Sequence, residues 1–219
     1  MAFIIEKRRD FLKKAIIATT ALPLITSCRN DVVAQRSGNE VLDAIRKNAR
    51  PHGAEGMGAI DFPSDVRPKF DLATKEDKGE LMKISGTVYE PDGKTPAANT
   101  LIYLYHTDIE GYYGRRSNEH KHGRYRGWML TNNDGRYSFV TIKPAPYPVQ
   151  RFAAHIHMTV TTPTAREDWV DSILFEGDRL ISSRERADAG KRGGFNPIVS
   201  LKKGDGDLFY ATRDIQLMT

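Results

Sequence analysis

Cysteine and long apolar runs are what this sequence has least of. Its 219 residues include a single cysteine, Cys28, which excludes a disulfide framework and any Cys-x-x-Cys zinc or redox site. The apolar run over residues 15–27 is well short of the roughly 20 residues that a helix needs to span a bilayer. With 39% hydrophobic and 28% charged residues, the composition argues against a multi-span membrane protein and against wholesale disorder.

The first 27 residues have the pattern of an export signal. Basic residues at positions 7–9 precede the apolar run, and Cys28 follows it. The Arg8-Arg9 pair is typical of the twin-arginine type, and residues 25–28 resemble a bacterial lipobox, whose cysteine carries the lipid. We therefore predict an exported protein that is lipid-anchored through Cys28 to the periplasmic or cell-surface side of a bacterial membrane. The alternative is a basic amphipathic helix with a buried cysteine, which Pro23 would interrupt.

Without this signal, the chain has almost no excess of positive charge. The whole chain has 33 Lys and Arg against 28 Asp and Glu, a formal net charge of +5. Removing residues 1–27 takes away five of the basic and two of the acidic side chains, which leaves 28 against 26. No basic patch interleaved with aromatic residues remains, so we expect no nucleic-acid partner.

The remaining chain divides into two parts by composition. Residues 28–78 are polar and interrupted by Gly and Pro, and we interpret them as a tether and lead-in with one short amphipathic helix around residues 41–45. Residues 79–219 form the predicted folded domain, in which apolar residues recur with period two and turns are rich in Gly and Asp. The pattern indicates an all-β fold with little helix, an antiparallel β-sandwich or barrel. We expect strands over residues 83–89, 101–106, 136–140, 155–162, 173–175 and within 209–217.

Two histidines stand two residues apart in one of these predicted strands. Side chains at that spacing share a face of the strand, so His155 and His157 present both imidazoles on one side while Ile156 turns to the other. This arrangement suits a metal ion. An isolated pair of this kind is also compatible with two surface or hydrogen-bonded histidines.

Two tyrosines provide a context for this pair. Tyr147 stands between two prolines, which restrict the backbone and hold the residue in an extended turn, and Tyr113 follows a predicted inner strand. With nine tyrosines in the chain, each one alone is compatible with a structural role. Phenolate is a sensible ligand for a hard, highly charged ion such as Fe(III), so two Tyr with two His would suit a ferric site.

Residues 101–160 resemble the intradiol ring-cleavage dioxygenases, the protocatechuate and catechol group. The resemblance rests on motifs in the family's order and continues into Glu176-Gly177-Asp178 and Asp214-Ile215-Gln216-Leu217, over about 140 residues in all. The motifs are Tyr105-His106-Thr107-Asp108-x-x-Gly111-x-Tyr113, Arg126-Gly127-x-x-x-Thr131, Asp134-Gly135-x-Tyr137-Ser138-Phe139, Thr141-Ile142-x-Pro144-x-Pro146-Tyr147-Pro148 and Ala154-His155-Ile156-His157.

The resemblance implies an Fe(III) cofactor held by Tyr113, Tyr147, His155 and His157. It also implies that Tyr147 leaves the iron when substrate binds and so takes part in catalysis. The implied substrates are a catechol-type aromatic ring and O2. The implied reaction opens the ring between its two hydroxylated carbons to a cis,cis-muconate-type product, with metal and substrate carrying the redox chemistry.

The chain departs from the family pattern close to this site. The family's charge-stabilising Arg stands three residues before the first His, where this chain has Phe152; Arg151, one residue earlier, is our candidate for that role. An often aromatic pocket position is Val149 here. A second pair, His120 and His122, stands in a loop dense in charge, which we interpret as solvated.

A rival interpretation comes from the turn and strand pattern alone. That pattern also resembles prealbumin-like β-sandwich modules that catalyse nothing, which would make the protein a binding or structural lipoprotein. Both interpretations predict an all-β, antiparallel, prealbumin-like β-sandwich, and the four candidate ligands distinguish them. Nothing in the sequence excludes a homo-oligomer.

Overall fold

The computed structural model describes residues 38–51, 58–113 and 120–218. The chain separates into two compact units, Met1–Gly38 and Asn39–Thr219, and the description that follows concerns the second. The predicted signal and Cys28 lie outside the described residues. Among the residues described, no helix combines the length and apolar character needed to cross a membrane.

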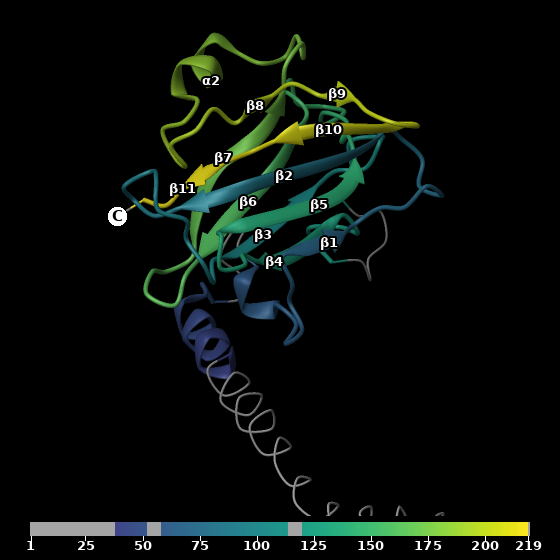
Figure 1. Cartoon of the computed structure of the whole chain (residues 1–219). Coiled ribbons are helices and arrows are strands. Elements are labelled where there is room, and N and C mark those ends of the chain that lie inside the picture. Colours follow the sequence, from purple (N-terminus) through teal and green to yellow (C-terminus); the bar gives the residue numbers. More distant parts are fainter. Residues whose placement is uncertain (1–37, 52–57, 114–119, 219) are drawn as a thin grey trace, which may run out of the picture. The chain divides into compact units, whose positions relative to one another are not determined.

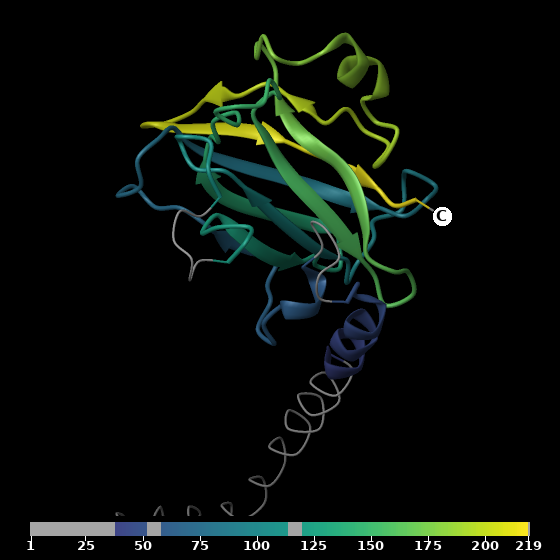
Figure 2. The same ribbon diagram turned by 180° about the vertical axis from the view of Figure 1, so that it is seen from behind.

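Two mixed β-sheets form this unit, and the layers are seen from opposite sides in Figures 1 and 2. The first sheet has the strand order β1 (Lys69–Asp71), β5 (Arg136–Ile142), β2 (Leu81–Tyr89), β10 (Leu208–Thr212) and β9 (Lys202–Lys203), with β11 (Ile215–Gln216) also paired to β2. The second has the order β4 (Arg126–Leu130), β3 (Leu101–His106), β6 (His155–Thr161), β7 (Asp168–Phe175) and β8 (Ile198–Val199). Short helices occur at η1 (Ala59–Asp61) and α2 (Ser183–Asp188).

The two sheets enclose one apolar core between their facing surfaces. Met82 and Ile84 of β2 lie in the same buried cluster as Ile156 and Met158 of β6, all without exposed surface. Burial of each such side chain contributes roughly 1.5–3 kcal/mol. The predicted all-β sandwich is therefore confirmed. The long central pairs are antiparallel as predicted, whereas β1, β8, β10 and β11 pair in parallel because their chain segments return to a sheet by crossing over.

The turn at residues 132–135 connects the two layers. The Gly135 amide donates to the Asn132 carbonyl (2.9 Å), and Gly135 has a φ of 68°, which favours glycine. The strands on either side, β4 and β5, belong to different sheets. A tight β-turn therefore carries the chain from one sheet of the sandwich to the other.

The lead-in residues pack against the outer surface of the second sheet. Residues 38–48 are helical, in agreement with the predicted short helix, and Ile45 is buried with Phe62 and Leu101. The buried Glu167 carboxylate, at the start of the β7 segment, accepts hydrogen bonds from the amides of Gly58 (2.9 Å) and Ala59 (3.0 Å). Further donors to this carboxylate are the Arg50 amide (3.1 Å) and the Thr159 hydroxyl (2.8 Å).

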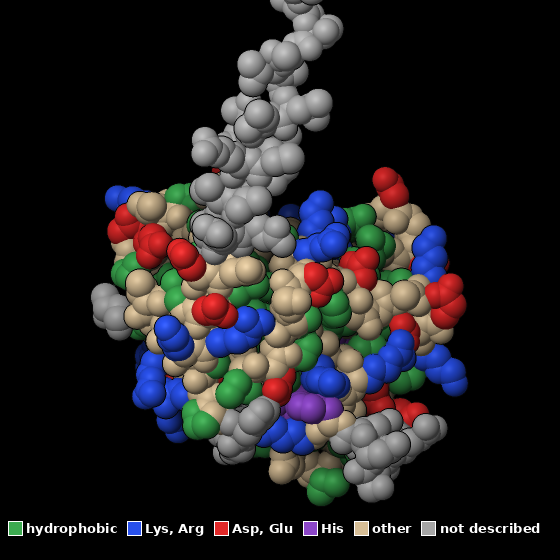
Figure 3. All heavy atoms as spheres, turned by 90° about the horizontal axis from the view of Figure 1, so that it is seen from below, with side chains coloured by type: hydrophobic (Ala, Val, Ile, Leu, Met, Phe, Trp, Pro, Cys, Tyr) green, Lys and Arg blue, Asp and Glu red, His purple; other side chains and the backbone are tan. Residues whose placement is uncertain are grey.

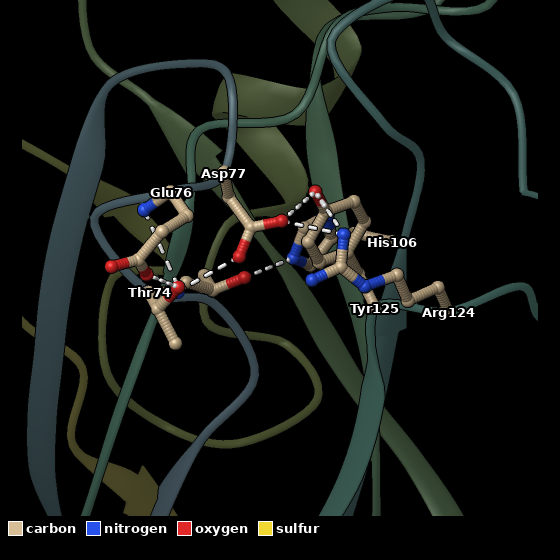
Figure 4. A network of polar contacts seen from close by, with 7 residues as sticks. Thr74, Glu76, Asp77, His106, Arg124 and Tyr125 are labelled. Atoms are coloured by element: carbon tan, nitrogen blue, oxygen red, sulfur yellow. Dashed lines mark hydrogen bonds and ion pairs between the residues drawn. The ribbon is translucent and has the colours of Figure 1, made fainter.

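A second polar network closes the end of the sandwich where β3 ends (Figure 4). Asp77 pairs with Arg124 (2.5 Å) and accepts the Tyr125 hydroxyl (3.2 Å). The Tyr125 ring stacks on His106, whose Nδ1 and Nε2 contact the Thr107 carbonyl (2.7 Å) and the Thr141 hydroxyl (2.6 Å). The network joins the loop after β1 to β3 and β5.

Charges are mixed on the face shown in Figure 3, where Lys and Arg side chains are interspersed with Asp and Glu. Because charges of opposite sign lie next to each other, neither sign produces a strong electrostatic field over this face.

We predict that Glu167→Gln destabilises the protein, because the NH2 group of the glutamine side chain would face backbone amides that themselves need a hydrogen-bond acceptor. The expected loss is about 2–4 kcal/mol in the free energy of unfolding, measured by urea denaturation. Glu176→Gln is the matched control, since Glu176 is exposed and paired only at the surface with Arg186; it should leave the midpoint unchanged. A Glu167 variant as stable as wild type would show that this carboxylate does not secure the lead-in.

We also predict a pH-dependent contribution from His106. Burial lowers the pKa of this imidazole from 6.5 to about 4, so between those values the unfolded chain binds a proton that the folded chain does not. The contribution is fully present above pH 6.5 and is lost as the pH falls toward 4. The stability difference between wild type and His106→Gln should therefore shrink by on the order of 3 kcal/mol from pH 7 to pH 4. A difference that is constant across this range would contradict it.

Candidate metal centre

Strand β6 carries the two predicted histidines on the outer surface of the second sheet. Because side chains alternate along a strand, Ile156 and Met158 enter the core while His155 and His157 face away from it. Their rings lie edge to face with centroids 4.5 Å apart, and the two Nε2 atoms are 3.0 Å apart. The imidazoles thus converge on one point.

Two loops bring the predicted tyrosines to the same point. The Thr107 hydroxyl donates to the Ala145 carbonyl (2.7 Å), and the Ala145 amide donates to the Asp108 carbonyl (3.0 Å). Between them Gly111 adopts a φ of 83°, and a Cβ there would lie 2.2 Å from the Pro146 carbonyl oxygen, so only glycine permits this approach. The loops that carry Tyr113 and Tyr147 are therefore docked on each other.

The four side chains form one cluster. The hydroxyls of Tyr113 and Tyr147 are hydrogen-bonded to each other, and the Tyr147 oxygen lies 3.4 Å from Nε2 of His155 and 3.3 Å from Nε2 of His157. Donors held 2.0–2.1 Å from one ion at tetrahedral or square angles lie about 2.9–3.4 Å apart. We call Tyr113, Tyr147, His155 and His157 the tyrosine–histidine cluster; the distances among Tyr147, His155 and His157 fit a metal ion, and the role of the four residues as a ligand set stays a prediction.

The hydrogen bonds of the imidazoles leave the Nε2 lone pairs facing inward. His155 donates from Nδ1 to the Ala153 carbonyl (2.7 Å), and His157 Nδ1 lies 3.4 Å from the Ser172 hydroxyl. Burial lowers the pKa of both histidines, that of His157 to about 3 with a further contribution from the neighbouring His155. Both rings are therefore neutral at physiological pH, as metal coordination requires.

Burial shifts the pKa of the two phenols in the opposite direction from that of the histidines. Burial raises the pKa of Tyr113 and of Tyr147, and their mutual hydrogen bond raises that of Tyr113 further. A nearby cation of high charge would reverse this, because it stabilises phenolate directly. In the described ranges, no three side chains of His, Cys, Asp or Glu gather as a metal site. The oxygen donors of this centre are thus phenolic, which suits a hard trivalent ion such as Fe(III).

A β-bulge shapes the strand next to the cluster. Ile156 pairs with Ile173 but Met158 pairs with Val170, so β7 has one extra residue opposite His157. The bulge brings both Asp171 and Ser172 to the site, where they line the cavity described below.

An aromatic stack supports His157 from the other side. The register places Tyr105 of β3 directly opposite His157, and their rings stack at 4.7 Å. His122 stacks on the far face of Tyr105 at 4.0 Å and is held by the Tyr103 hydroxyl (2.5 Å). The prediction of a solvated His120–His122 loop is wrong for His122, which is buried because this stack gives its ring both an aromatic partner and a hydrogen bond.

A cavity of about 410 Å³ opens beside the cluster. Tyr147, His155 and His157 face it, and α2 and the bulge of β7 form the opposite wall. Phe152 lines it as well, with its ring edge-on to Tyr147 (6.2 Å).

Arg151 is exposed and is not among the residues that line this cavity, so its predicted role stays a prediction. The cavity instead has Arg184 of α2. Sequence reasoning missed α2, although Ser182-x-x-Glu185 is a capping-box signal for a helix start.

The dioxygenase family model matches residues 63–194, more than half of the chain and a range that contains the whole cluster. The chain belongs to the intradiol dioxygenase family. It is 29% identical over 141 residues to the protocatechuate 3,4-dioxygenase beta chain of Burkholderia cepacia, covering 60% of this chain and 58% of that protein. It is 30% identical over 161 residues to hydroxyquinol 1,2-dioxygenase of Nocardioides simplex, covering 64% and 54%. The chain thus spans little more than half the length of these curated relatives.

Solved structures agree on the fold of this intradiol family member. The dioxygenase domain from Streptomyces sp. SirexAA-E superimposes with a TM-score of 0.52 at 21% identity, over 77% of this chain and 96% of that one. Catechol 1,2-dioxygenase from Acinetobacter sp. ADP1 superimposes with a TM-score of 0.54 at 19% identity, over 70% and 57%.

We predict that the Tyr105 ring positions His157. Tyr105→Phe keeps the stack and should retain metal within about three-fold of wild type, whereas Tyr105→Leu should weaken retention by 10-fold or more, as loss of a group that orients a ligand does. Metal retained per chain is measured against a competing chelator, with thermal unfolding to check the fold. Equal retention by the folded Leu variant would exclude the positioning role.

Proposed function

We propose that this protein is a ferric dioxygenase that cleaves a catechol-type ring between its two hydroxylated carbons with O2. The product would be of the cis,cis-muconate type. The observation that carries the proposal is the tyrosine–histidine cluster, in which two phenol oxygens and two neutral imidazole nitrogens converge in a member of the intradiol family. The curated relatives are named as dioxygenases of protocatechuate, hydroxyquinol and catechol. A non-catalytic sandwich module has no use for such a cluster.

Bound Fe(III) would supply the Lewis acid that accepts the two catechol oxygens and makes the ring reactive toward O2. The residues present fit that ion, because the Tyr147 oxygen and the two Nε2 atoms are spaced as ligands of one ion, the imidazoles are neutral and the phenols respond to a high positive charge.

The two tyrosines differ in what they face. Both tyrosines line a second cavity of about 400 Å³, but of the two Tyr147 alone also lines the 410 Å³ cavity together with both histidines. A substrate that enters the first cavity therefore meets the Tyr147 oxygen first. As a phenolate beside bound Fe(III), that oxygen would be placed to receive a proton from a catechol hydroxyl, while Tyr113 keeps its position.

Two arginines are candidates for stabilising the charge on the substrate. Arg151 remains the proposed residue from the family pattern, and Arg184 is a second candidate because it already lines the cavity. Turnover that is unchanged in Arg151→Ala but reduced in Arg184→Ala would assign the role to α2.

We further propose that the protein is exported and lipid-anchored at Cys28, as its N-terminal pattern indicates. Lipid labelling of wild type but not of Cys28→Ala would support the anchor, and labelling of both would overturn it.

Two substitutions test the centre. His155→Ala should abolish iron binding, because it removes one of four donors, and Tyr147→Phe should lower kcat with catechol at least 100-fold, because it removes the oxygen that receives the proton. Iron per chain, the visible absorption of ferric tyrosinate and O2 uptake are measured after expression in iron-replete medium.

Tyr210→Phe is the matched control, since Tyr210 is an exposed tyrosine on β10. It should keep both colour and turnover. A colourless wild-type protein without iron would refute the proposed function, whereas full activity in Tyr147→Phe would refute the role given to Tyr147.

A further inference from the structure

The cavity next to the tyrosine–histidine cluster is larger than a single catechol ring requires. Its volume of about 410 Å³ lies within the range of cavities that hold drug-sized ligands, roughly 300–1,000 Å³. Phe152, Leu174 and Pro197 provide an apolar lining. A substituent on the ring therefore has room, and the charged side chains of the opposite wall decide which kind is favoured.

Helix α2 places one carboxylate firmly in that wall. Its capping box is complete: the Glu185 amide donates to the Ser182 hydroxyl (3.1 Å), and the Ser182 amide donates to the Glu185 carboxylate (2.7 Å). This reciprocal bonding fixes the half-buried Glu185 side chain. Glu185 lines the same cavity as Tyr147 and His155 of the cluster.

The charges that line the cavity do not balance. Asp171, Glu185 and Asp188 face it, and Arg184 is the one cation among its described lining residues. Arg184 lies 3.5 Å from Asp188, which Lys191 also contacts at 2.5 Å, so Asp188 is compensated by cations.

The hydrogen bonds to the other two carboxylates come from uncharged groups in the described residues, but the Arg213 guanidinium lies beside Asp171 and donates to its backbone carbonyl (3.3 Å), so Glu185 is the less compensated of the two. Asp171 accepts from the backbone amides of Gly190 (2.9 Å) and Arg192 (3.0 Å), and Glu185 accepts from Ser182. Hydrogen bonds of this kind hold a carboxylate in place without neutralising its charge. The wall therefore presents a net negative field to whatever lies between it and the cluster.

We propose that this wall makes the protein selective for catechols whose ring substituent is uncharged or positively charged, and that it disfavours catechols with a carboxylate. The proposal rests on the proposed function, because it concerns the substrate of the same cavity. It also distinguishes between the named relatives: protocatechuate has a carboxylate on its ring, whereas catechol and hydroxyquinol have none. By this criterion the wall favours the second kind of substrate.

The test compares two probes that differ in charge but hardly in size. Iron-loaded full-length protein is assayed with 3,4-dihydroxybenzamide and 3,4-dihydroxybenzoate, both of which have an electron-withdrawing group at the same carbon. We expect kcat/KM to be about 10-fold higher for the amide, because the negative charge of the wall repels the carboxylate of the benzoate in a partly solvated site. A catechol with an ethylammonium substituent should be cleaved at least as efficiently as the amide.

Glu185→Gln isolates the charge, because glutamine can keep the capping box. The amide-to-benzoate ratio should fall about three- to five-fold in this variant, with kcat/KM for unsubstituted catechol within two-fold of wild type. Asp171→Asn should lower the same ratio by less, because the neighbouring Arg213 offsets part of the charge of Asp171. Asp207→Asn, a carboxylate exposed outside the cavity, should leave the ratio unchanged.

The outcomes separate the two proposals. If no catechol is cleaved, the proposed function fails. If all three are cleaved and the benzoate is as good a substrate as the amide, or if neither cavity variant changes the ratio, the function stands and the charge selection is overturned.

Discussion

The pairing of β6 with β3 on one edge and β7 on the other determines where every group of the candidate centre lies. The pairing with β3 sets Tyr105 directly opposite His157, so the stacked ring restricts the imidazole. The pairing with β7 includes the bulge that brings Asp171 and Ser172 to the same imidazole. A slip of one residue in either register would turn both histidines into the core and two apolar side chains outward. The apolar core of the sandwich therefore protects the geometry of the site.

The electrostatics of the tyrosine–histidine cluster follow from this location. The side chains lie against the sheet, where burial opposes charge on all four. For the histidines the result is the neutral form that coordinates a metal, and for the tyrosines it is the protonated form that coordinates poorly. A cation must therefore displace two phenolic protons, which weakly charged ions do less readily than a trivalent one. The same burial that prepares the nitrogens thus makes the oxygens selective for highly charged ions.

Much of this arrangement was predictable from short-range patterns. Period two identified β2 and the shared face of the histidines on β6, a run of apolar and aromatic residues identified β3, and a turn signal identified the start of β5. The order of motifs pointed to Tyr113 and Tyr147. The parts that sequence reasoning missed depend on contacts between distant segments. The burial of His122 requires Tyr103 and Tyr105 from another element, and the bulge is defined only by comparing two paired strands. The capping box was a local signal for helix α2, but no local pattern predicts that this helix lies beside the cavity.

The candidate centre and the charged wall of the cavity are held largely by different elements of the fold, and this affects substrate specificity. The groups of the candidate centre come from β6 and from two docked loops, whereas the charged wall combines Asp171 of the β7 bulge with residues of α2, which begins beyond the end of β7 and β8 (Figure 1). The α2 residues of this wall contribute no donor to the cluster, and the hydrogen bonds of Glu185 are local, within the capping box. Substitutions there change the field in the cavity without disturbing the registers that hold the histidines. Substrate preference in this chain can therefore vary independently of the chemistry, since the two are set largely by different elements of one sandwich.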